Sequence, residues 1–154
     1  MDLKDFERRF LKAFGERVED ASSFTVARNS SDILLITKPA PSEAFGYLGI
    51  LVPDAGTVAI GCEITETSFY AWTYEQDRKD PVQGMIDEAL ELVNHILRGE
   101  VYAKVVHHKS GSPALSGFYK ADEAPLGRAS AVLDKHFGGE SAVTEYAWAG
   151  LTKH

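Results

Sequence analysis

Hydrophobic side chains recur at helical spacing in two segments of the chain, residues 2–15 and 80–98. In the first segment the recurring residues are Leu3, Phe6, Phe10, Leu11 and Phe14. The second segment starts with a capping aspartate, has Pro81 in its first turn and carries a wide apolar stripe. Gly15 and Gly99 are predicted to end the two helices, because glycine adopts the conformation of a helix C-cap at little cost. Both helices are expected to pack across a sheet.

Alternating apolar and polar residues predict strands in most of the remaining chain. Five stretches lie between the two helices, at residues 23–28, 32–38, 45–52, 57–64 and 68–75, and mostly short turns connect them. After the second helix come strands at 101–107 and 115–120, a short helix at about 126–137 and a strand at about 143–149. The order α-βββββ-α-ββ-α-β predicts an α+β fold with a mainly antiparallel sheet: a five-strand meander, a later hairpin and a C-terminal strand. No linker or repeat divides the chain, so residues 1–154 are expected to form a single domain.

The stretch SFYAWTYE (68–75) brings several aromatic residues into one predicted strand. Alternate residues of a strand point to opposite faces, so Tyr70, Trp72 and Tyr74 are predicted to share one face. Tyrosine and tryptophan combine a large contact area with a polar group and are enriched at protein interfaces. The stripe could be exposed and bind a partner, or it could be part of the core. Tyr146 and Trp148 repeat the alternation, and could extend the stripe or fill the core beside it.

Negative charge is concentrated in one part of the chain. The formal net charge is −7, and residues 63–91 hold eight acidic against two basic residues. The acidic residues of this segment are Glu63, Glu66, Glu75, Asp77, Asp80, Asp87, Glu88 and Glu91. Nucleic-acid binding depends on clustered lysine and arginine that neutralise phosphates, so we expect no nucleic-acid partner.

The N-terminal segment carries charges throughout and lacks the apolar stretch of a signal peptide, and no run of 18 apolar residues occurs. We therefore expect no membrane association and a cytoplasmic location. The single cysteine cannot form an internal disulfide, which agrees with a reducing compartment.

Few residues have the spacing of a chemical site. Cys62 lies in the apolar alternation VAIGCEI, which is typical of an inert core cysteine rather than a nucleophile. His107 and His108 are adjacent at a strand end, so they point to opposite faces and cannot hold one metal together while the strand continues. Glu63 and Glu66 could form an acid/base pair or an acidic rim. We predict no catalytic residue, metal or cofactor, and keep these residues for an alternative function, a small enzyme or ligand-binding domain with a pocket between sheet and helices.

The strand VYAKVVHH is predicted to have one drier and one wetter face. The first set is Val101, Ala103, Val105 and His107, and the second, wetter set is Tyr102, Lys104, Val106 and His108.

Together these patterns predict a non-enzymatic, acidic protein-binding module, whose partner is another protein with a basic or mixed surface. The predicted partner-binding residues are Tyr70, Trp72, Tyr74, Glu63, Glu66, Glu75 and Asp77. A homodimer through an edge strand or the aromatic face is a further expectation. In size, acidity and coarse element order the chain resembles two bacterial groups, small immunity proteins that neutralise toxins and dimeric secretion chaperones, although its final strand departs from the chaperone pattern. No residue motif carries either resemblance, so it implies a role but no site residues.

Overall fold

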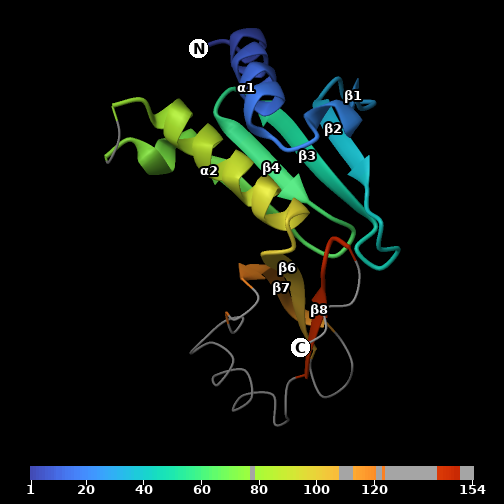
Figure 1. Ribbon diagram of the computed structural model, residues 1–154. Coiled ribbons are helices and arrows are strands. Elements are labelled where there is room, and N and C mark those ends of the chain that lie inside the picture. Colours follow the sequence, from blue (N-terminus) through green and yellow to red (C-terminus); the bar gives the residue numbers. More distant parts are fainter. Residues whose placement is uncertain (77–78, 108–112, 121–122, 124–141, 150–154) are drawn as a thin grey trace.

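The chain has an α+β fold with two helices and two antiparallel sheets (Figure 1). The computed structural model describes residues 1–76, 79–107, 113–120, 123 and 142–149. No helix within these residues is long and apolar enough to cross a membrane. The expected helix near the C-terminus lies outside the described residues, and the predicted order of the other elements is confirmed.

The described helices and strands are α1 (Leu3–Arg17), β1 (Thr25–Arg28), β2 (Leu34–Pro39), β3 (Tyr47–Asp54), β4 (Thr57–Gly61), β5 (Glu66–Tyr70), α2 (Pro81–Leu97), β6 (Val101–His107), β7 (Pro113–Lys120) and β8 (Ala142–Tyr146). Short 3₁₀ segments precede β1 and follow β5. Sheet A is the predicted meander in the order β1-β2-β3-β4-β5, and sheet B has the order β7-β6-β8. All pairs are antiparallel.

Both helices begin as the sequence predicts. Asp2 and Asp80 accept hydrogen bonds from the backbone N–H groups three residues later, at 2.9 and 3.1 Å. Helix α1 does not end at Gly15 as predicted, but continues to Arg17. Gly15 is exposed and nothing packs against it, so the α-helical conformation costs this glycine only its intrinsic propensity of about 1 kcal/mol.

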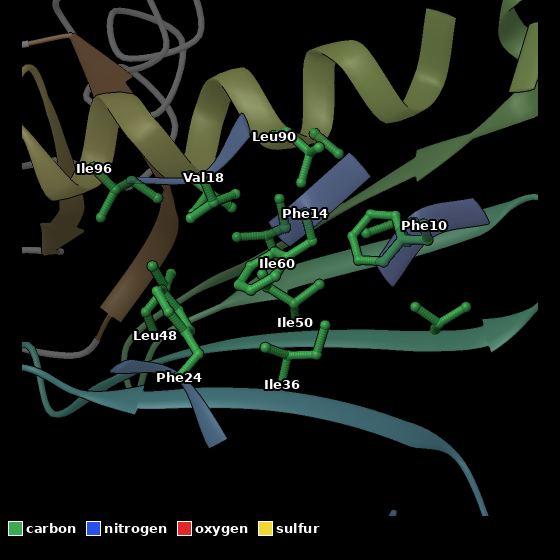
Figure 2. Close-up of a cluster of buried hydrophobic side chains, with 14 of the residues drawn as sticks. Phe10, Phe14, Val18, Phe24, Ile36, Leu48, Ile50, Ile60, Leu90 and Ile96 are labelled. Carbon is green, nitrogen blue, oxygen red and sulfur yellow. The ribbon is translucent and has the colours of Figure 1, made fainter. Parts of the chain in front are cut away.

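Helices α1 and α2 cover the same face of sheet A, and the main core lies between these two layers (Figures 1 and 2). Phe10 and Phe14 point down from α1, Leu90 points down from α2, and Ile50 meets them from the sheet. Polar groups join the two helices at their edges: Arg9 donates to the Asp80 carboxylate at 2.6 Å, and Arg17 pairs with Asp87. The ion pair to Arg9 lowers the pKa of Asp80, together with the hydrogen bond of the helix cap.

The other face of sheet A is not covered by any described helix or strand, and we call it the open face. Strand register places its side chains: Thr25, Ala27, Leu35, Thr37, Pro39, Tyr47, Gly49, Leu51, Thr57, Ala59, Gly61, Ser68 and Tyr70, with Asp54 and Glu66. Asp54 and Glu66 are the only charged residues among these paired positions, and they lie at opposite ends. Most side chains on the open face are therefore small and uncharged.

The prediction of a drier and a wetter face for β6 is wrong. Tyr102, Lys104 and Val106 are buried, and so are Val101, Ala103 and Val105 on the opposite side. The Lys104 side chain is 2% exposed, donates from Nζ to the carbonyl oxygen of Glu123 at 2.7 Å, and lies 3.4 Å from a carboxylate oxygen of Glu145 on the neighbouring strand β8. A lysine in a strand is accommodated inside the protein here because a carboxylate and a carbonyl replace its water.

Candidate protein-binding surface

Strand β5 ends at Tyr70, so the predicted strand over 68–75 is wrong in its second half. The neighbouring strand β4 begins at Thr57, which pairs with Tyr70, and the turn before Thr57 offers no further strand for pairing. Residues Ala71–Tyr74 form a 3₁₀ turn instead, in which the Thr73 hydroxyl donates to the Tyr70 carbonyl at 2.8 Å. The strict alternation of aromatic side chains therefore stops at Tyr70.

The 3₁₀ turn separates the three predicted aromatic residues. Tyr70 is 40% exposed and Trp72 is 67% exposed, and their ring centroids are 5.9 Å apart with the planes tilted by 33°. This separation is within the range of favourable aromatic pairs. Tyr74 turns the other way, packs against the core and donates from its hydroxyl to the carboxylate of Glu88 on α2. The exposed aromatic pair thus consists of Tyr70 and Trp72, without Tyr74.

The predicted acidic residues divide between the two ends of β5. Glu75 is exposed and follows the 3₁₀ turn, where its N–H donates to the Trp72 carbonyl at 3.4 Å. Glu66 is exposed at the start of β5, four residues before Tyr70 and so about 13 Å from it. Glu63 is exposed at that same distant end, where its side chain occupies the space beside Gly46. Asp77 lies outside the described residues.

Two features of this surface were missed by the sequence prediction. Tyr47 on β3 is 44% exposed and lies on the open face, at the end of the sheet near Glu66. Asp54 is exposed on β3 and pairs with Thr57, which in turn pairs with Tyr70. Asp54 therefore lies at the same end of the open face as Tyr70, and Tyr47 lies at the opposite end. Following the alternation of the stretch YLGIL across the turns would have found Tyr47. The open face consequently has exposed aromatic rings and exposed carboxylates at both ends.

A concave surface lies between α2, β5 and β7, and we call it the β5–β7 cleft. Two adjoining hollows of about 410 and 330 Å³ form it. Phe69, Leu92 and Phe118 line both hollows. The other lining residues are Glu66, Thr67, Ser116, Gly117 and Tyr119 in the first, and Glu88, Glu91, His95, Val101, Lys120 and Glu123 in the second. This cleft is open and lies where the edges of the two sheets meet beside α2.

Comparison with known proteins assigns no family or function to the chain. No protein-family model matches the chain, and no curated protein or solved structure matches it either. The resemblance in size and element order to immunity proteins and secretion chaperones stays a prediction.

The residues kept for an alternative chemical function are only partly brought together: Glu63 and Glu66 lie at the same end of sheet A, whereas Cys62 and His107 belong to different sheets. Cys62 is buried against the core of sheet A, whereas His107 ends β6 in sheet B and is only partly buried. His108 lies outside the described residues. Within the described part of the chain, no group of three histidine, cysteine, aspartate or glutamate side chains is placed to hold a metal ion.

The prediction that the Cys62 thiol is unreactive can be tested directly. Burial raises the pKa of its thiol, so little of the reactive thiolate is present at neutral pH. We expect iodoacetamide at pH 7.5 to modify Cys62 at least about tenfold more slowly in the folded protein than in urea. Mass spectrometry of timed samples measures both rates. Equal rates would show an accessible thiol and reopen the nucleophile hypothesis.

Proposed function

We propose that this chain is a non-enzymatic protein-binding module whose partner docks over Tyr70 and Trp72. The observation that carries the proposal is the exposed aromatic pair, with 5.9 Å between ring centroids, at one end of the open face, where most side chains are uncharged. Burying an exposed tryptophan and tyrosine against a partner supplies a few kcal/mol, because both rings remove a large apolar area from water. Exposed aromatic residues of this kind are typical hot spots.

The partner's chemistry follows from the charges around the open face. The exposed carboxylates of Asp54 and Glu75 lie on the side of Tyr70 and Trp72, and Glu66 lies at the other end. A partner with an apolar centre and basic residues around it fits this arrangement. The carboxylates would mainly speed and select the encounter, and the aromatic rings would supply most of the affinity.

Replacing Tyr70 and Trp72 together with serine is expected to abolish capture of the partner while leaving the fold intact. A lysate of the source cell is passed over the immobilised protein at low and high salt, and the retained proteins are identified by mass spectrometry. The matched control is Val26→Ser, which also removes an exposed apolar side chain from sheet A, but on the opposite edge strand β1 and outside the open face. The proposal is supported by a basic protein that the unchanged chain and the control both retain, and whose retained amount falls at least about tenfold with the double variant.

Circular dichroism on all three proteins checks that the double variant is folded. A protein retained equally by the unchanged chain and the double variant would show that the aromatic pair is not the docking site. Retention that does not weaken as the salt concentration rises would contradict the role of the carboxylates.

A further inference from the structure

The outer edges of two sheets border the β5–β7 cleft. Strand β5 is the last strand of sheet A and β7 is an outer strand of sheet B, and among the described strands each pairs on one side only. The two edges approach each other at one end of the cleft, where the Ser116 hydroxyl donates to the Thr65 hydroxyl at 2.9 Å. An unpaired strand edge presents backbone N–H and C=O groups that can pair with another extended chain.

The two edges differ in how they are protected. Strand β7 has Pro113 at its start and Lys120 at its end, and these residue types discourage pairing at an exposed edge. Strand β5 has the sequence ETSFY, with neither proline nor lysine. Of the two edges, the β5 edge is therefore the better suited to pair with a further strand.

The lining of the cleft selects the chemistry of that strand. Phe69, Leu92 and Phe118 give it an apolar floor. Four carboxylates line it, against one lysine and one histidine: Glu66, Glu88, Glu91 and Glu123, with Lys120 and His95. The histidine is itself held between acids, with Nδ1 2.5 Å from Glu100 and Nε2 3.3 Å from Glu91. An incoming chain with apolar and basic residues complements both features.

We propose that the β5–β7 cleft binds an extended, basic segment of a partner protein, which adds a sixth strand to sheet A at the free edge of β5. Main-chain hydrogen bonds to β5 hold the segment, its apolar side chains cover Phe69, Leu92 and Phe118, and its lysine or arginine side chains reach the carboxylates. The inference goes beyond the function proposed above, because it uses the edge of β5 and does not require Tyr70 or Trp72. Its test uses a synthetic peptide, so it can fail or succeed independently of the lysate experiment.

The probe is a fluorescein-labelled octapeptide of alternating lysine and valine, and fluorescence polarisation measures its binding to the purified chain. We expect saturable binding. The Glu66→Lys/Glu91→Lys double variant is expected to bind at least about tenfold more weakly. The matched control is Glu16→Lys/Glu43→Lys, which changes the net charge equally at exposed positions outside the cleft, and it should stay within about twofold of the unchanged chain.

Two further peptides test the strand geometry and the charge. A lysine-valine peptide with alternate backbone amides N-methylated should lose binding, because it cannot complete the ladder of hydrogen bonds. A glutamate-valine peptide should not bind. The backbone amides of Glu66–Tyr70 that point away from β4 should exchange hydrogen at least about tenfold more slowly when the lysine-valine peptide is bound.

The outcomes that would overturn the proposal are distinct. Absence of saturable binding, or equal weakening by both double variants, would show that the cleft does not recognise a basic strand. Equal binding of the N-methylated peptide would exclude pairing with the β5 edge. A concentration-dependent dimer in sedimentation that protects the β5 amides without any peptide would assign the edge to a second copy of the chain instead.

Discussion

Replacing Lys104 with alanine is expected to lower the free energy of unfolding by about 3–5 kcal/mol. The side chain is 2% exposed in the central strand of sheet B, where its ammonium group contacts a carboxylate oxygen of Glu145 at 3.4 Å and the Glu123 carbonyl at 2.7 Å. Alanine removes this cation from a carboxylate that is only 24% exposed, and leaves a cavity where the four-carbon chain was. Urea unfolding followed by circular dichroism measures the change.

Lys104→Met is the matched variant, because methionine fills nearly the same volume without the charge. It should cost clearly less than alanine, and pairing it with Glu145→Gln should recover part of the loss, since the carboxylate is then no longer charged. Alanine costing less than about 1 kcal/mol would show that Lys104 contributes as a surface ion pair does. Equal losses for alanine and methionine would show that the charge, and not packing, dominates.

The order and type of the described elements were predictable from the sequence because local patterns determine them. Apolar residues at helical spacing, a capping aspartate and a proline in the first turn identify α2 without any tertiary information. The alternating stretches and short turns of sheet A identify a meander, since short connections favour antiparallel neighbours. These interactions lie within a few residues of each other along the chain.

The errors concern properties that depend on distant residues. Strand β5 ends at Tyr70 because its partner strand β4 begins at Thr57. The local sequence around Tyr70 does not reveal which residue of β4 it pairs with. Lys104 is buried because Glu145, on another strand, lies beside it. A single-strand pattern assigns a lysine to the wetter face and cannot anticipate such a partner.

The candidate sites were predictable to a smaller extent than the fold. The sequence indicated Tyr70 and Trp72 correctly as neighbours, but it placed Tyr74 beside them and grouped Glu66 with them, although Glu66 lies at the other end of β5. The β5–β7 cleft could not be predicted, because it requires the edge of sheet A and the edge of sheet B to meet beside α2. Which residues share a surface is set by topology.

Replacing Trp148 with alanine is expected to cost about 3–5 kcal/mol of unfolding free energy. Trp148 follows β8, is 6% exposed and packs edge to face on Phe45, with ring centroids 5.6 Å apart and planes at 82°. Its carbonyl oxygen also accepts a hydrogen bond from the Ser42 N–H at 3.3 Å. Trp148 thus packs the end of β8 in sheet B against the loop between β2 and β3. Because it is buried, it belongs to the core and not to an exposed aromatic stripe.

The same variant tests the prediction that residues 1–154 form a single domain. Trp148 belongs to the hydrophobic cluster that also contains Phe10 of α1 and Ala103 of β6, so its loss should destabilise both sheets together. Urea transitions followed by circular dichroism and by the fluorescence of Trp72, the remaining tryptophan, should coincide at a lower midpoint. Trp148→Phe should recover most of the loss, since it keeps an aromatic contact with Phe45. Two separated transitions in Trp148→Ala would instead show that the sheets unfold as independent units and that the chain contains two domains.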